Sequence, residues 1–156
     1  MQLSRRCLEV FAAFRNPVVI ITKNHLVTRD LDLLGELARY EAAAVYLSIT
    51  TLDSHISRTL EPRASHPTRR LAALTALTQA GVPAGVLVAP VIPGLTDHEV
   101  PSIIAAAVRA GARDAGYGTL RRPHGVGPLF EAWLTQLRRV AKTKCSGACG
   151  RCTVAG

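Results

Sequence analysis

Apolar positions follow two alternating patterns along this chain, one helical and one typical of strands. Helical spacing predicts helices over residues 3–14, 28–40, 66–79, 97–110 and 128–140. Short apolar runs predict strands over residues 18–22, 45–50, 82–92 and 115–120. Thr28 and the pair Thr96-Asp97 are the predicted N-caps of the second and fourth helices. Cys7 falls on the apolar side of the first helix and is expected in the core.

A helix follows each of the first three predicted strands, which is the rhythm of βαβ units and a parallel sheet. Four strands do not close an eight-stranded barrel. The predicted fold class is therefore α/β, as an incomplete (β/α) TIM-like barrel of about four parallel strands. A small doubly wound sheet is the alternative, but Thr22-Lys-Asn-His25 after the first strand is not a glycine-rich phosphate loop.

Length and composition fit one small α/β domain without a membrane span. The chain has 156 residues, of which 48% are hydrophobic, and no apolar run approaches the roughly 20 residues that cross a bilayer. The first ten residues lack the apolar centre of a signal peptide, so the cytoplasm is the expected location.

Positive charge concentrates near the C-terminus. The net charge is +8, with +1 in residues 1–108 and +7 in residues 109–156. We expect a partial barrel over residues 1–140 and a basic, disordered tail over residues 141–156. Such asymmetry is found in nucleic-acid-binding arms and in solvated tails.

Polar residues cluster where the predicted strands end. Lys23 follows the first strand, and Ser48 and Thr50 end the second. The third strand stops at Pro93-Gly94 and leads into the next helix. The carboxyl ends of parallel strands form one rim, where α/β proteins bind ligands. Lysine at such a rim pairs with carboxylates, and hydroxyls hold a ribose. No pattern identifies a catalytic acid, base or nucleophile.

Five segments in order resemble the radical SAM superfamily, in particular the branch similar to spore photoproduct lyase. They are Ile-Ile-Thr-Lys (20–23), Arg-Asp-Leu-Asp-Leu-Leu (29–34), Leu-Ser-Ile-Thr-Thr-Leu-Asp (47–53), Thr-Leu-Glu-Pro-Arg-Ala (59–64) and Ala-Pro-Val-Ile-Pro-Gly-Leu-Thr-Asp-His-Glu (89–99). The resemblance covers residues 3–133 and implies the third to sixth βα units of a partial barrel. It also implies a truncated chain without the unit that holds the family's cysteine loop.

The resemblance implies two cofactors, S-adenosylmethionine and a four-iron four-sulfur cluster that an electron donor reduces. Lys23 would contact the methionine carboxylate, and Ser48 with Thr50 the ribose or methionyl group. Ile92, Pro93 and Gly94 would pack on the adenine. Pro90 replaces the first glycine of the family's adenine motif, and Asp97 or Glu99 would supply its acid. Four arginines would face either a phosphate-bearing substrate such as nucleic acid or solvent: Arg58, Arg63, Arg69 and Arg70.

Three cysteines near the C-terminus keep the spacing of the family's cluster ligands. Cys145, Cys149 and Cys152 form a Cys-x3-Cys-x2-Cys pattern. This is a displaced cluster site, a zinc site that lacks a fourth ligand, or an accidental spacing in a disordered tail. The alternative function is accordingly a basic nucleic-acid-binding module on an α/β scaffold, with or without zinc.

Overall fold

The computed structural model describes residues 3–120 and 125–135. The chain divides into two units, Met1–Leu120 and Arg121–Gly156. In the second unit, residues 127–135 are helical, and the Phe130 and Trp133 rings stack with centroids 5.4 Å apart. The predicted domain boundary at residue 140 and the predicted tail lie outside the described residues.

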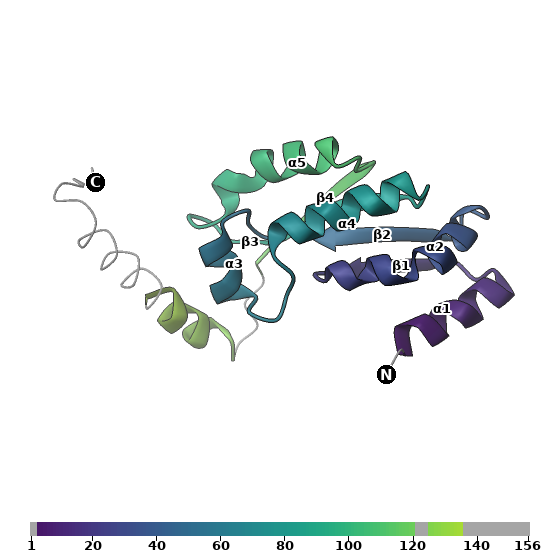
Figure 1. Ribbon diagram of the computed structural model, residues 1–156. Helices are drawn as coiled ribbons and strands as arrows, with labels where there is room; N and C mark the ends of the chain where they lie inside the picture. Colours follow the sequence, from purple (N-terminus) through teal and green to yellow (C-terminus); the bar gives the residue numbers. More distant parts are fainter. Residues whose placement is uncertain (1–2, 121–124, 136–156) are drawn as a thin grey trace. The chain divides into compact units, whose positions relative to one another are not determined.

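Four parallel strands form the sheet of the first unit (Figure 1). They are β1 (Val18–Thr22), β2 (Ala43–Ser48), β3 (Ala84–Val91) and β4 (Asp114–Thr119). Their order in the sheet is the order in the chain, β1-β2-β3-β4, and every neighbouring pair is parallel. A doubly wound sheet reverses its strand order partway, so that alternative is wrong for these strands. The α/β class and the partial TIM-like barrel are confirmed.

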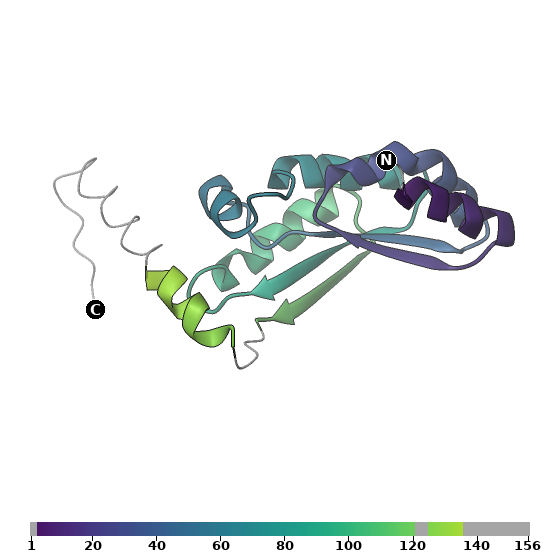
Figure 2. The ribbon, with the colours of Figure 1, turned by 90° about the horizontal axis from the view of Figure 1, so that it is seen from below.

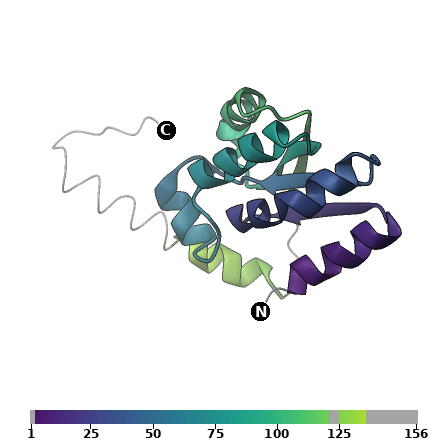
Figure 3. The same cartoon turned by 45° about the vertical axis from the view of Figure 1, so that its right-hand side comes forward.

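The helices of the first unit lie on one side of the sheet (Figure 2). They are α1 (Leu3–Phe14), α2 (Leu31–Ala38), α3 (Ser54–Leu60), α4 (Pro67–Gln79) and α5 (Val100–Arg109). Helix α1 packs against α2 (Figure 3). The short helix α3 was not predicted. It begins where the Asp53 carboxylate accepts the backbone N–H groups of His55 and Ile56. No helix in the described ranges is long and apolar enough to cross a bilayer.

Both predicted threonine caps are wrong, because the hydroxyl of each threonine makes a different hydrogen bond. A 3-10 turn, His25–Asp30, precedes α2, and Asn24 caps it by accepting the N–H of Leu26. The Thr28 hydroxyl instead donates to the His25 carbonyl. A second 3-10 turn, Asp97–Glu99, precedes α5. Thr96 makes no cap bond there and accepts the N–H of Ile92.

The core lies between the sheet and the helices. Alternate residues of β2, such as Val45 and Leu47, are fully buried against the helices. Fully buried leucines and an isoleucine of the helices meet them: Leu34, Leu37, Leu74, Leu77 and Ile103. The other face of β1 is open, with Val19 63% and Ile21 61% exposed. Cys7 is exposed rather than in the core, because its neighbour Leu8 is the buried residue of α1.

Candidate functional site

The predicted rim residues meet at the carboxyl ends of β1 and β2. Thr22 pairs with Leu47 in the sheet, so Lys23, the residue after β1, lies beside Ser48, the last residue of β2. Thr50 follows two residues later. The sheet register therefore places these three predicted residues at one edge.

Glu61, in the loop after α3, connects these residues. Its Oε1 accepts a hydrogen bond from Lys23 Nζ at 2.6 Å and one from Thr50 Oγ1 at 2.8 Å. Its Oε2 accepts from Arg70 Nη2 at 2.6 Å. The Glu61 side chain is 9% exposed, whereas that of Lys23 is 41% exposed. One nearly buried carboxylate thus holds two cations and a hydroxyl.

Arg70 links the same carboxylate to the end of β2. Its Nη1 donates to the Ser48 carbonyl at 2.7 Å, and its Nε donates to the Ser65 carbonyl at 2.6 Å. Arg70 is 1% exposed, so both predictions for this residue, a solvated helix face and a substrate contact, are wrong. Arg58, Arg63 and Arg69 are exposed, which agrees with both expectations for them, a solvated face and a substrate contact.

The surroundings of Glu61 favour its ionised form. Burial is the largest single influence and by itself raises the pKa of the carboxyl group. The hydrogen bonds from Lys23, Thr50 and Arg70 act in the opposite direction and together outweigh burial, so the pKa lies below its ordinary value. The network therefore contains a carboxylate at neutral pH.

This lowered pKa predicts a loss of stability in acid. In the unfolded chain the carboxyl group binds a proton near pH 4.5, whereas in the folded chain it binds one only at lower pH. The contribution of Glu61 is therefore complete above that pH and is lost as the pH falls through the folded pKa. We expect urea unfolding at pH 5.5 and 3.5 to show a smaller loss of stability in Glu61→Gln than in the unsubstituted protein. Equal losses in the two proteins would contradict this assignment.

The hydroxyls of Ser48 and Thr50 also lie close to β3. Ser48 Oγ donates to the Ala89 carbonyl oxygen at 3.2 Å. Thr50 Oγ1 lies at the same distance from that oxygen, but its single hydrogen makes the shorter bond, to Glu61. Hydroxyl oxygens that donate in this way keep lone pairs for an incoming donor.

The turn after β3 is closed by its own side chains. Ile92 is 2% exposed, its N–H donates to Thr96 Oγ1 at 3.0 Å, and its carbonyl accepts from the backbone N–H of Thr96. The Gly94 N–H holds the pKa of the Asp97 carboxyl below its ordinary value. Pro93 and Gly94 are exposed, and Gly94 has a φ of +72°, which suits glycine. Of the three predicted adenine contacts, Pro93 and Gly94 are therefore exposed and Ile92 is buried.

Glu99 ties the turn after β3 to the loop after β2. Its Oε1 accepts from Thr51 Oγ1 at 2.5 Å, and its Oε2 accepts the Leu52 N–H at 2.7 Å. Asp97 and Glu99 are the two acids that the sequence suggested for the adenine motif. Glu99 contacts the neighbouring loop after β2. Asp97 contacts the backbone of its own turn.

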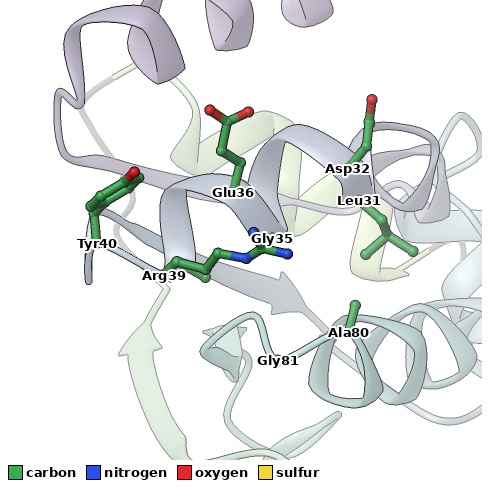
Figure 4. Close-up of a pocket in the computed structure, with 9 residues that line it drawn as sticks. Leu31, Asp32, Gly35, Glu36, Arg39, Tyr40, Ala80 and Gly81 are labelled. Carbon is green, nitrogen blue, oxygen red and sulfur yellow. The ribbon is translucent and has the colours of Figure 1, made fainter.

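Two hollows lie near opposite ends of the strands. A cleft of about 410 Å³ is lined by Lys23, Asn24 and Glu61 together with residues 62–64. A larger hollow of about 630 Å³ lies between α2 and the turn before β3, where Arg39 extends beside Gly35 on the side of Ala80 and Gly81, and Glu36 points away from them (Figure 4). We assign the candidate site to the smaller cleft, because it contains Lys23 and Glu61 and lies at the carboxyl ends of the strands.

No group of three potential metal ligands occurs in residues 3–120 and 125–135. Cys7 is exposed on α1, and the predicted ligands Cys145, Cys149 and Cys152 lie outside the described residues. The described residues therefore do not supply the thiolates of a cluster.

Sequence reasoning missed Glu61 as a site residue. It lies in a short loop between two helices, so the positions of the strand ends do not predict that it belongs to the site. Arg70 carried a usable signal, because it shares one side of α4 with the buried residues Pro67, Leu74 and Leu77. A charge within an apolar stripe indicates a buried partner, and Glu61 is that partner.

Comparison with known proteins gives a family match and several relatives. Residues 3–107 match the family model of the radical SAM superfamily. The uncharacterized protein Rv2578c of Mycobacterium tuberculosis is 33% identical over 127 residues, which cover 80% of this chain and 37% of that protein. The uncharacterized protein ORF301 of Acidianus two-tailed virus is 38% identical over 90 residues, which cover 58% and 29% of the two chains. The chain thus spans about a third of the length of these relatives. No solved structure gives a significant match.

Proposed function

Because this chain belongs to the radical SAM superfamily, we propose that it binds S-adenosylmethionine at the carboxyl ends of β1 to β3 as part of a radical enzyme. Together with a reduced four-iron four-sulfur cluster, this cofactor supplies a 5′-deoxyadenosyl radical. The observation that carries the proposal is the network in which Glu61 joins Lys23, Thr50 and, through Arg70, the end of β2 at Ser48.

The charges of the network suit a ligand with a carboxylate. Lys23 and Arg70 are two cations around the single carboxylate of Glu61, which leaves one positive charge in excess. Arg70 is buried, whereas Lys23 is partly exposed at the cleft. Lys23 is therefore the cation that would bind the methionine carboxylate by a charge-assisted hydrogen bond.

Hydroxyl and apolar groups would hold the rest of the cofactor. Ser48 and Thr50, which are 3% and 2% exposed at the end of β2, are the residues whose hydroxyl oxygens would accept hydrogen bonds from ribose hydroxyls. The exposed Pro93 and Gly94 would offer a surface for the adenine ring. We assign no catalytic acid or base.

We propose that the enzyme belongs to the branch similar to spore photoproduct lyase and acts on a phosphate-bearing substrate such as nucleic acid. The exposed Arg58, Arg63 and Arg69 and the net charge of +7 in residues 109–156 support an anionic substrate. The spacing of Cys145, Cys149 and Cys152 supports cluster binding by these residues. Iron–sulfur chemistry requires reduced thiols, which favours the cytoplasm.

The role of Lys23 predicts a loss of cofactor affinity. Replacing Lys23 by methionine removes a charge-assisted hydrogen bond, so we expect S-adenosylmethionine to bind at least about tenfold more weakly in isothermal titration calorimetry. Arg39→Met, in the hollow of Figure 4, is the matched control and should leave the affinity unchanged. The proposal is wrong if the unsubstituted protein does not bind S-adenosylmethionine, or if both variants bind it equally well.

A further inference from the structure

A smaller hollow lies between α4 and the 3-10 turn His25–Asp30. These two elements pack against each other and leave between them a space of about 250 Å³. Its lining residues are His25 and Thr28 of the turn and Arg69, Ala72, Ala73 and Ala76 of α4. None of them lines the cleft that contains Lys23 and Glu61. The hollow is therefore separate from the proposed cofactor site.

Arg69 brings an unpaired positive charge to this hollow. Its guanidinium has no hydrogen-bond or ion-pair partner among the described residues, whereas the next residue, Arg70, has three acceptors. No acidic residue is among the described residues that line the hollow. A guanidinium in such surroundings favours an anionic group that offers two oxygens, such as a phosphate or a carboxylate.

His25 adds a second polar group, and three contacts fix its position. Its backbone N–H donates to Ser65 Oγ at 3.0 Å, and its carbonyl accepts from the Thr28 hydroxyl at 2.9 Å. Its ring Nδ1 lies 2.9 Å from Ser65 Oγ. The other ring nitrogen, Nε2, has no partner in the part of the chain that the structure describes. Nε2 is thus the nitrogen that is available to a ligand.

Ser65 lets the neutral ring of His25 offer Nε2 as a donor. The single hydrogen of the Ser65 hydroxyl has two acceptors within reach, Asn24 Oδ1 at 3.0 Å and His25 Nδ1 at 2.9 Å. When the hydroxyl donates to Nδ1, the proton of the ring is on Nε2. Asn24 Oδ1 then still accepts the Leu26 N–H, so this arrangement leaves no acceptor unpaired.

We propose that this hollow binds a small organic anion, with Arg69 and His25 Nε2 donating to its phosphate or carboxylate group. The methyl groups of Ala72, Ala73 and Ala76 would contact a short apolar body. The volume of about 250 Å³ is smaller than the roughly 300 Å³ at which sites for drug-sized ligands begin, which favours a body of a few carbon atoms. The inference does not depend on the binding of S-adenosylmethionine.

Titration of the full chain with four probes tests the proposal. The probes are methyl phosphate, propyl phosphate, butyrate and 1-propanol, and the readout is the NMR signals of the His25 ring and the Arg69 side chain. We expect propyl phosphate to bind at least about fivefold more tightly than methyl phosphate, because each fully buried methylene group contributes roughly fourfold. The neutral 1-propanol should not bind.

The four probes also distinguish the two kinds of anionic group. Tighter binding of butyrate than of propyl phosphate would support the proposal with a carboxylate as the anionic group, and the reverse order would support it with a phosphate. The absence of binding by both would overturn the proposal. Equal affinity of methyl phosphate and propyl phosphate would overturn the role of the alanines.

Replacing Arg69 by methionine tests the charge. We expect the tighter anion to bind at least about fivefold more weakly, since an ion pair at a partly solvated site contributes up to about that factor. Arg69 is exposed, so the variant should fold. Arg109→Met removes an exposed arginine from α5 and is the matched control. Equal affinities of the two variants would overturn the proposal.

Replacing Ala72 by leucine tests the location. The larger side chain would fill part of the hollow and should abolish the preference for propyl phosphate over methyl phosphate. Ala105→Leu makes the same change at an exposed position of α5 and should preserve that preference. Lys23→Met should also leave the affinity unchanged. A loss of binding in Lys23→Met but not in Arg69→Met would place the anion in the other cleft and overturn the proposal.

Discussion

Replacing Arg70 by methionine is expected to lower the free energy of unfolding by about 3 to 5 kcal/mol, the usual effect of removing one partner of a buried ion pair. Arg70 is 1% exposed and donates to Glu61 and to the carbonyls of Ser48 and Ser65. The substitution keeps much of the side-chain volume, so the decrease in the free energy of unfolding measures the contribution of the charge and the three hydrogen bonds. Urea unfolding followed by circular dichroism at neutral pH measures it.

The neighbouring Arg69 provides the control for this substitution. It lies on the same helix, α4, but is exposed. Arg69→Met should therefore change the free energy of unfolding by no more than about 0.5 kcal/mol, as is usual for surface positions. Similar losses in both variants would show that Arg70 has no special part in holding the rim together.

Replacing Gly85 by alanine is expected to cost about 2 to 3 kcal/mol of stability, because β3 has no room for a methyl group there. A Cβ at this position would lie 2.7 Å from the Asp114 carbonyl oxygen and 2.8 Å from Cε1 of the Tyr46 ring. The tyrosine ring belongs to a side chain, whereas the carbonyl is backbone of the neighbouring strand β4, so the two strands would have to separate. Thermal unfolding should show a clearly lower Tm.

Gly118 offers the matched control within the same sheet. A Cβ at Gly118 would lie 3.5 Å from that of Ala89, which is an ordinary contact. We expect Gly118→Ala to keep the Tm of the unsubstituted protein or to raise it slightly. If Gly85→Ala is equally well tolerated, the two strands are less tightly packed than the structure indicates.

Hydrophobic patterning was sufficient to predict the sheet. Each of the four predicted strands overlaps an observed one, because β-branched runs bounded by turn residues have few alternative structures. Patterning failed at the helix starts, where several side chains compete for the same N–H groups. Asn24 and Thr28 are both good caps by residue type, and only the three-dimensional structure shows that Asn24 reaches the Leu26 N–H.

The candidate site was predictable to the extent that strand ends define it. Lys23, Ser48 and Thr50 follow directly from the strand positions. Glu61 does not, because its contact with Lys23 joins residues 38 positions apart through a loop whose path the sequence pattern does not determine. The hydrogen bond between Thr51 and Glu99 joins residues 48 positions apart. Local hydrophobic periodicity cannot predict it, for the same reason.

The carboxylate of Glu99 makes two loops behave as one cooperative unit. Its two oxygens accept hydrogen bonds from the Thr51 hydroxyl and the Leu52 N–H, in the loop after β2. Glu99 itself ends the turn that precedes α5. Local opening of either loop must break the same pair of hydrogen bonds. The ribose side and the adenine side of the proposed pocket are therefore expected to loosen together.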